Sequence, residues 1–212
     1  MSDFNKLSEA VNKGDTKTAL AEVQKALDGG SSAEEILDKG LIIAMNEVGD
    51  NYSKGLIFVP QMLRSAKTMQ ECTNLLQPFF QEGDIVSKGK VLIGTVKGDL
   101  HDIGKNLVSM MLEGAGFTIT DLGVDISPEK FVEKTREVEP DIIGLSALLS
   151  TTMPAMGLTI EALQKAGLRD KVKVIIGGAP VTEKYAQQIN ADSYASDAGS
   201  AVNKAKALLG IS

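Results

Sequence analysis

The chain contains a single histidine, His101, in a stretch rich in acidic residues and glycine, GTVKGDLHDIGKN. Asp99 precedes this histidine by two residues, and Asp102 follows it directly. A carboxylate at either position could hold one ring nitrogen of the imidazole and leave the other nitrogen free for a metal. Because a lone histidine on a loop is more often a surface or structural residue, spacing alone slightly favours a structural role.

Several familiar sites are excluded by residue type. With one histidine and one cysteine, Cys72, the chain has no multi-cysteine metal site and no internal disulfide. A zinc site would need two further carboxylates at a spacing that the sequence lacks. A Walker-type phosphate loop needs Ser or Thr after its lysine, but Asn106 follows Lys105. One metal chemistry remains open, in which His101 is an axial ligand to a metal already held by a macrocycle.

Composition indicates an ordinary soluble protein of 212 residues, with 43% apolar and 24% charged residues. The net charge of −6 argues against binding to nucleic acid or to an anionic membrane. The N-terminal MSDFNKLSEA has no signal-peptide core, and no apolar run approaches membrane-spanning length, so we expect a cytoplasmic protein. Cys72 lies in an amphipathic helical stretch, which predicts a buried, inert thiol.

The first part of the chain predicts an all-α helical bundle, assigned with its linker to residues 1–88. Ser32 and Glu35 form a candidate capping box, and Pro60 fits the first turn of a helix. The apolar residues recur at helical spacing. The predicted helices cover residues 4–11, 16–27, 33–50 and 60–77.

From residue 89 onwards, short β-branched runs alternate with helical stretches. This alternation predicts a C-terminal α/β domain, residues 89–212, with a flavodoxin-like (Rossmann-like), doubly wound parallel sheet of five strands. The predicted strands cover residues 90–96, 117–122, 141–147, 171–178 and 192–196. The predicted helices cover residues 104–115, 128–138, 152–166, 181–190 and 198–210.

Parallel sheets bind ligands beyond the carboxyl ends of their strands, at the point where strand order reverses. In the order 2-1-3-4-5 this point lies between the first and third strands, so it brings together the loops KGDLHDIG and SALLSTTM. We expect one hydroxyl of the second loop to cap a helix. Three glycines near the first loop suggest a close approach of a ligand to the backbone. The residues expected at this edge are His101, Ser146, Ser150, Thr151, Thr152, Gly177 and Gly178, with Gly94, Gly98 and Gly104 as the three glycines.

These motifs resemble those of cobalamin-dependent methyltransferases and mutases. The pattern Asp99-x-His101-x-x-Gly104 is followed by Ser146-x-Leu148 and then by Gly177-Gly178. The strings GDLHDIGKN, DLGVD and GLSALLSTT are similar to the methyltransferase branch, and FVPQMLRSAKTM resembles the helical cap domain of that branch. The resemblance covers nearly the whole chain and is to the small corrinoid proteins that serve methylamine, methanol, betaine or methoxy-aromatic methyltransferases.

The resemblance implies that cobalamin is the cofactor and that His101 ligates its cobalt in place of the cofactor's own base. Asp99 would hydrogen-bond the imidazole, and Thr152 would complete a proton relay. Ser146, Leu148, Gly177 and Gly178 would line a slot for the displaced nucleotide tail. The full set of implied cofactor-binding residues is Gly98, Asp99, Leu100, His101, Asp102, Ile103, Gly104, Ser146, Leu148, Ser150, Thr151, Gly177, Gly178, Phe58 and Met62.

Two further groups follow from the resemblance. The helical domain would shield the methyl-bearing face of the cofactor, although apolar residues at helical spacing are usually bundle core. The link at 81–89 is a candidate hinge for moving this cap. Candidate shielding residues are Phe58, Val59, Met62 and Met69. Candidates near the nucleotide end are Asp192, Tyr194, Asp197 and Ala198.

The implied function is that of a methyl carrier. A substrate-specific corrinoid methyltransferase would deliver a methyl group to cobalt, and a second methyltransferase would pass it to a thiol (coenzyme M) or to tetrahydrofolate. A reductive activase would be a third partner. Two alternatives share the motifs: a cobalamin sensor, which would need a DNA-binding module, and the small subunit of a mutase, which would not need the N-terminal bundle.

Overall fold

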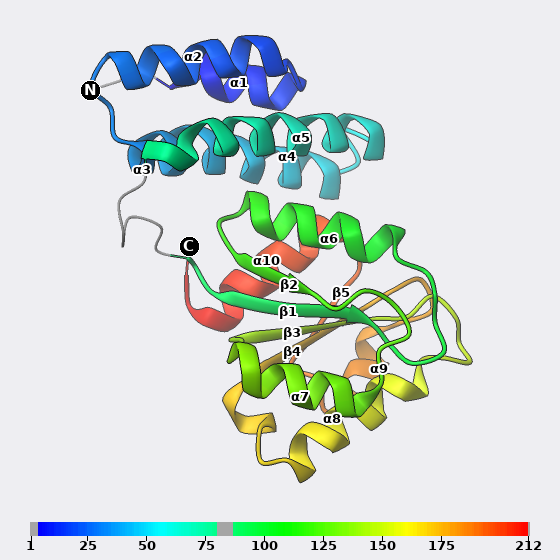
Figure 1. The fold of residues 1–212 in the computed structure, drawn as a ribbon. Coiled ribbons are helices and arrows are strands. Elements are labelled where there is room, and N and C mark those ends of the chain that lie inside the picture. Colours follow the sequence, from blue (N-terminus) through cyan, green and yellow to red (C-terminus); the bar gives the residue numbers. More distant parts are fainter. Residues whose placement is uncertain (1–3, 80–86, 212) are drawn as a thin grey trace. The chain divides into compact units, whose positions relative to one another are not determined.

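The computed structural model describes residues 4–79 and 87–211 of the chain (Figure 1). The chain divides into two compact units. The first comprises Met1–Ser87 with Gly114–Gly116, and the second comprises Lys88–Glu113 with Phe117–Ser212. The predicted hinge at 81–89 lies mostly outside the described residues, which resume at residue 87.

The first unit is helical, as predicted. Its elements are α1 (Asn5–Lys13), α2 (Thr16–Asp28), α3 (Ala33–Ile36), a π-helical segment (Leu37–Ile42), α4 (Ile43–Ser53), α5 (Val59–Leu76) and a short 3-10 turn (Gln77–Phe79). The Ser32 hydroxyl caps α3 by accepting the Glu35 N–H at 3.1 Å. Glu35 itself pairs with Lys39 at 2.8 Å, so Ser32 supplies the predicted cap and the carboxylate lies on the helix surface.

A π-helical segment interrupts the helix predicted over 33–50. It contains Gly40, where an added Cβ would lie 2.7 Å from Leu7 Cδ2. The Ser8 hydroxyl donates to the Gly40 carbonyl at 3.1 Å. The bare backbone at Gly40 therefore lets α1 pack closely against this wider helical turn, which the hydrophobic period alone did not predict.

The second unit contains a five-stranded parallel sheet of order β2-β1-β3-β4-β5, which confirms the predicted fold class. The strands are β1 (Lys90–Thr95), β2 (Thr118–Asp121), β3 (Ile142–Ser146), β4 (Lys173–Gly177) and β5 (Ser193–Ala195). The helices are α6 (Ile103–Gly114), α7 (Pro128–Val138), α8 (Pro154–Lys165), α9 (Glu183–Gln188) and α10 (Ala198–Leu209), with a 3-10 turn at Arg169–Lys171. Figure 1 shows α6 and α10 on one face of the sheet and the other helices on the opposite face.

The register aligns the ends of the three central strands. Thr95 of β1 pairs with Ser146 of β3, and Ser146 pairs with Gly177 of β4. Because parallel strands end at the same edge, the segments that follow these three residues begin side by side. The motifs lie far apart along the chain, and this register brings them to one edge of the sheet.

Gly94 has a packing role inside the sheet. An added Cβ there would lie 2.9 Å from Phe131 Cζ, and Phe131 is a fully buried residue of α7. Helix α7 therefore needs the bare backbone at this point of β1. The expectation that Gly94 serves a close approach of ligand is wrong, because the space beside it is filled by the core.

We expect Gly94→Ala to lower the free energy of unfolding of the cobalamin-free protein by about 1–3 kcal/mol, because Phe131 must move. Gly104→Ala is the matched control, since an added Cβ there meets nothing within 4 Å. Urea unfolding followed by circular dichroism measures both. Equal midpoints for the two variants would contradict the packing role of Gly94.

The thiol of Cys72 is buried in α5 with no exposed surface. Burial raises its pKa to about 12, and the neighbouring Glu71 carboxylate adds to the shift. The native thiol should therefore resist 5,5′-dithiobis(2-nitrobenzoate) and react fully in urea.

The unfolded thiol ionises at about pH 8.5. The contribution of Cys72 to stability should therefore be complete below that pH and fall as the pH rises towards 12, a slope that Cys72→Ala should lack. Rapid labelling of the native protein would contradict this description.

Candidate functional site

Asp99 lies in a tight turn directly after β1. Its backbone N–H donates to the Val96 carbonyl at 3.1 Å, and Gly98 adopts a φ of +83° at the third position of this turn. A type II turn requires a positive φ at that position, which glycine adopts without strain. The turn directs Asp99 into the protein, where the residue has no exposed surface.

The Asp99 carboxylate joins the loops that follow β1 and β3. Its Oδ1 accepts the His101 backbone N–H at 3.0 Å and lies 2.8 Å from His101 Nδ1. Its Oδ2 accepts the N–H groups of Leu148 at 2.8 Å and Leu149 at 3.3 Å, and the Thr152 hydroxyl at 2.6 Å. The structure thus brings together Asp99, His101 and Thr152, as the strand order predicted.

These hydrogen bonds decide the charge of Asp99. Burial alone would raise the pKa of the Asp99 carboxyl, but the bonds from Thr152, His101 and the Leu148 backbone hold it well below its usual range. The carboxylate is therefore ionised at neutral pH and can only accept hydrogen bonds. In a neutral imidazole the proton accordingly lies on Nδ1, so Nε2 presents a free lone pair. The side chain of His101 is half exposed, at 51%.

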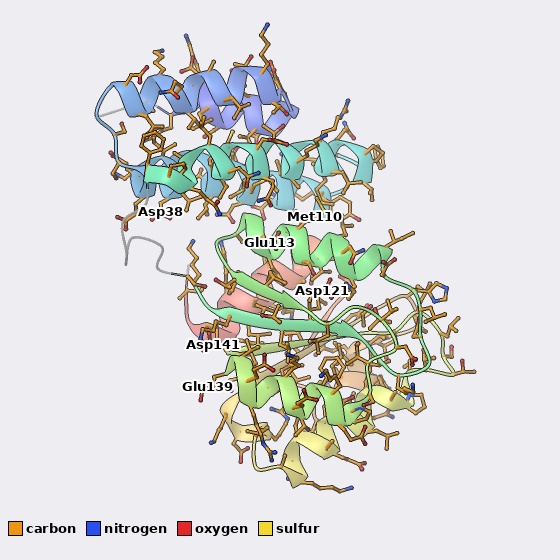
Figure 2. All side chains as sticks on the ribbon, in the orientation of Figure 1. Asp38, Met110, Glu113, Asp121, Glu139 and Asp141 are labelled. Atoms are coloured by element: carbon orange, nitrogen blue, oxygen red, sulfur yellow. The ribbon has the colours of Figure 1, made fainter. Side chains whose placement is uncertain are left out.

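Asp102, the other carboxylate next to the histidine, has a different partner. It accepts the Asn106 amide at 3.1 Å. Asn106 in turn accepts from the buried Lys105 Nζ at 2.6 Å, and Lys105 also forms an ion pair with Asp121. Asp121 is the last residue of β2, and Figure 2 labels it on the side of the sheet that α6 covers. The sequence left Asp99 and Asp102 open as partners of the imidazole, and the structure selects Asp99.

Thr95, the last residue of β1, was not among the predicted site residues. This fully buried threonine donates its hydroxyl to the His101 carbonyl at 2.9 Å. It therefore holds the backbone of the histidine from inside the sheet. A hydroxyl within an otherwise apolar strand, KVLIGTV, is the signal that could have identified it.

The predicted helix cap in the SALLSTT loop is wrong. Met153 occupies the position before α8 and makes no side-chain cap. The Thr152 hydroxyl lies 2.6 Å from the Asp99 carboxylate and 2.9 Å from the Leu149 carbonyl. The ionised carboxylate is the stronger acceptor, so this hydroxyl donates to Asp99 instead of capping the helix. Ser150 and Thr151 are both exposed.

Four large apolar side chains are exposed on the two loops and at the start of α6. Leu100 is 71% exposed and Ile103 is 83% exposed, while Leu148 and Leu149 are each 43% exposed. Nothing lies within 4 Å of a Cβ added at Gly104, next to Ile103. Exposed apolar groups gathered around one half-exposed imidazole are typical of a ligand site.

Gly177, the last residue of β4, and Gly178, which follows it, are predicted to line a slot. A Cβ at Gly178 would lie 1.8 Å from the Ala147 carbonyl oxygen, and Gly178 has a φ of +130°. A Cβ at Gly177 would lie 3.1 Å from the Ala195 carbonyl oxygen. Contact between neighbouring backbones therefore requires glycine at 178 even without a ligand. Ser146, at the end of β3, is partly buried.

The residues predicted near the nucleotide end have structural partners. Asp192 pairs with Arg169 at 2.8 Å and accepts the Val174 N–H at 2.7 Å. Asp197 caps α10 by accepting the Ser200 N–H at 2.8 Å. Tyr194 is partly buried and Ala198 is buried. Their predicted place beside a nucleotide stays a prediction.

The candidate shielding residues of the helical unit differ in exposure. Phe58 is 69% exposed and Val59 is 36% exposed at the start of α5. Met62 is fully buried and Met69 is 5% exposed. In this conformation only Phe58 and Val59 present surface that a ligand could cover. A role of all four residues in shielding stays a prediction.

Comparison with known families identifies the chain. A family model described as B12 binding domain matches residues 89–207, and a second model of the same description matches residues 3–77. The chain belongs to the B12-binding family. No helix in the described part of the chain is long and apolar enough to cross a membrane.

Individual relatives agree with this family. The chain is 46% identical to "Dimethylamine corrinoid protein 1" of Methanosarcina acetivorans, over 97% of each chain. It is 33% identical to the crystal structure of a cobalamin-binding protein from Desulfitobacterium hafniense, covering 97% of this chain and 98% of that one, with a TM-score of 0.83. In a methanol:cobalamin methyltransferase complex from Methanosarcina barkeri, 98% of this chain matches 79% of one chain at 27% identity, with a TM-score of 0.86. This last match includes the N-terminal bundle. A mutase subunit would not need that bundle, so the match favours a methyltransferase-associated corrinoid protein over the mutase alternative.

The residues of this chain fit the cofactor of the family. His101 Nε2 is free to bind a metal, and Asp99 fixes the ring through the other nitrogen at 2.8 Å. A Cβ at Gly104 would meet nothing within 4 Å, and Leu100 and Ile103 expose apolar side chains that a corrin ring could cover. Within residues 4–79 and 87–211, no group of three His, Cys, Asp or Glu side chains could hold a metal ion by itself.

Replacing Thr152 by valine removes one donor from the ionised Asp99 while keeping the side-chain shape. We expect Thr152→Val to lower the free energy of unfolding of the cobalamin-free protein by about 2 kcal/mol, as for other hydrogen bonds to buried charges. Thr151→Val, at the exposed neighbouring position, should change it by less than about 0.5 kcal/mol. Urea unfolding of the two variants measures the difference. An equal loss in both would show that Asp99 does not depend on the Thr152 hydroxyl.

Proposed function

We propose that this protein is a methyl-carrier corrinoid protein in which His101 Nε2 is the protein ligand to the cobalt of cobalamin. The observation that carries the proposal is the arrangement of Asp99, His101 and Thr152 at the edge of the sheet. It leaves one imidazole nitrogen free and surrounds it with exposed apolar side chains. The family and the relatives support cobalamin as the cofactor.

When bound, cobalamin supplies a cobalt that accepts a methyl group and passes it on. The protein's part is to hold and protect the ligand nitrogen. Asp99 keeps the imidazole oriented by accepting from Nδ1, and its negative charge balances a positive charge on the ring if Nε2 takes up a proton instead of metal. Thr152 holds the other carboxylate oxygen, so Asp99 stays in place in both states.

The remaining site residues contribute shape. Leu100, Ile103 and Leu148 would exclude water from the lower face of the corrin, and Gly104 would let the ring approach the start of α6. Ser146, Gly177 and Gly178 would border the slot for the displaced nucleotide. The other proposed contacts are Gly98, Asp102, Ser150 and Thr151 of the two loops, with Phe58 of the helical unit. Met62 is buried in this conformation and would contact the cofactor only in another one.

The two parts of the chain would have separate tasks. Residues 89–212 would bind cobalamin, and residues 1–88 would form the cap domain and its linker. A cap that protects a methyl group also blocks its transfer, so it must move when a partner binds. Equal partner binding with the cap locked by a cross-link would contradict this part of the proposal.

The methyl donor that we propose is a methylated amine, dimethylamine in the first place. The support is the 46% identity to a protein named for dimethylamine over 97% of each chain. The first partner would be the corresponding corrinoid methyltransferase, in line with the solved methyltransferase complex of a structural relative. A second methyltransferase, acting on coenzyme M or tetrahydrofolate, and a reductive activase complete the proposed system.

Reconstitution with hydroxocobalamin followed by desalting tests the proposal. We expect the native protein to retain corrin, and Asp99→Asn to bind it about 10–100-fold more weakly because the ring loses its charged partner. Asp170→Asn, which changes an exposed carboxylate in the 3-10 turn at Arg169–Lys171, is the matched control and should retain corrin as the native protein does. Retained corrin can then be tested as a methyl acceptor with dimethylamine, trimethylamine and methanol, each with its methyltransferase. Failure of the native protein to retain corrin would contradict the proposed function.

A further inference from the structure

We propose that Asp125, in the loop between β2 and α7, is a positioning residue for His101. It acts on the backbone of Gly98 and Asp99 and so determines where the Asp99 carboxylate meets the imidazole. The inference rests on the proposed function in one respect, namely that His101 is the ligand whose orientation matters. Neither Asp125 nor its loop belongs to the set of residues assigned above to the cofactor.

Two hydrogen bonds connect Asp125 to the turn after β1. The Asp125 carboxylate oxygen Oδ1 accepts the Gly98 N–H at 2.8 Å. The Asp125 backbone N–H donates to the Asp99 carbonyl at 3.0 Å. One bond holds the peptide group before Gly98 and the other holds the peptide group after Asp99. Asp125 therefore fixes both ends of this dipeptide. The turn itself contributes one hydrogen bond, from the Asp99 N–H to the Val96 carbonyl.

The backbone of Asp125 itself is unusual. Within residues 4–79 and 87–211, Asp125 is one of three residues other than glycine with a positive φ, at +55°. The second, Glu139, ends α7, and the third, Asn190, follows α9, where a left-handed residue commonly ends a helix. Asp125 lies in a loop with no helix to end. A left-handed conformation of this kind persists where neighbouring contacts require it, and the two bonds to Gly98 and Asp99 are such contacts.

The position of the Asp99 backbone bears directly on the imidazole. Oδ2 of Asp99 is held by three donors from the loop after β3. With Oδ2 held in place, the direction in which Oδ1 points depends on the position of the Asp99 backbone, because the carboxylate is planar. Oδ1 is the atom that faces His101 Nδ1 at 2.8 Å. Thr95 fixes the His101 carbonyl, and the Asp125 carboxylate holds the start of the loop by accepting the Gly98 N–H.

Charge is the lesser part of this interaction. Asp125 also forms an ion pair with Lys97 at 3.1 Å, and both side chains are substantially exposed, at 41% and 58%. Exposed ion pairs of this kind contribute little. The bond to the Gly98 N–H is therefore the feature that a substitution should test, with the Lys97 pair as its control.

The single histidine makes a direct test possible, because every imidazole signal in the spectrum belongs to His101. The full-length, cobalamin-free protein is labelled with ¹⁵N-histidine, and long-range ¹H–¹⁵N correlation spectra at mildly alkaline pH report which ring nitrogen carries the proton. Asp99 should hold the native protein in the Nδ1–H form. Asp125→Gly keeps the backbone N–H and accommodates the left-handed φ, so it removes the acceptor for Gly98 together with the Lys97 ion pair. We expect this variant to lose the predominance of the Nδ1–H form.

Two matched variants separate the hydrogen bond from the charge. Asp125→Asn keeps an acceptor oxygen and tolerates the left-handed backbone, so it should retain the native spectrum. Lys97→Met removes the ion pair alone and should also retain it. In reconstituted protein, Asp125→Gly should raise the Kd for hydroxocobalamin about tenfold, at the lower end of the range for residues that support a metal ligand, while the other two leave it unchanged.

The proposal would be overturned if the Nδ1–H form of His101 still predominated in Asp125→Gly, or if it no longer predominated in Asp125→Asn. If Asp125→Gly lacks the native circular dichroism spectrum, Asp125→Ala, which has no side-chain acceptor, carries the same expectation. The two readouts also separate the two proposals. A native protein that shows the ordered tautomer but retains no corrin would contradict the proposed function and leave the role of Asp125 standing.

Discussion

A buried carboxylate, Asp99, is the constraint on which this site depends. An ionised group with no exposed surface is stable only when donors surround it. Asp99 receives these donors from two loops that lie far apart in the sequence, since Leu148 and Leu149 follow Asp99 by 49 and 50 residues. The loops after β1 and β3 must therefore be neighbours, which the strand order β2-β1-β3-β4-β5 provides. The turn at Gly98, the register of Thr95 with Ser146 and the place of Thr152 all serve this one group.

The same constraint determines what the imidazole can do. Since Asp99 is held as an acceptor, His101 donates from Nδ1 and keeps Nε2 for a ligand. The apolar side chains around it, those of Leu100, Ile103 and Leu148, offer area for contact with a ligand. They do not orient the imidazole, because each is exposed. Precision therefore comes from the backbone bonds of the turn, whereas affinity for a large ligand comes from apolar area.

The sequence predicted the fold and the place of the site, because both follow from the order of strands and helices along the chain. Strand–helix alternation determined the sheet, and the rule for switch points brought His101 and Thr152 to one edge before any contact was known. What it missed depends on particular contacts that the pattern of residue types does not reveal. Gly94 is explained by Phe131 on another element, Thr95 by a carbonyl six residues away, and the π-helical segment at 37–42 by the approach of Leu7. The choice of Asp99 over Asp102 likewise required the position of Asn106.

The central claim is that the nitrogen of His101 binds cobalt in place of the cofactor's own base. Electron paramagnetic resonance of the protein reconstituted with cob(II)alamin tests it directly, comparing unlabelled protein with protein labelled with ¹⁵N-histidine. Because the chain has one histidine, labelling changes a single possible ligand. Coordination by His101 predicts that the triplet splitting from ¹⁴N becomes a doublet on labelling. A triplet that persists in the labelled protein would mean that the benzimidazole of the cofactor remains the ligand, and it would contradict the account.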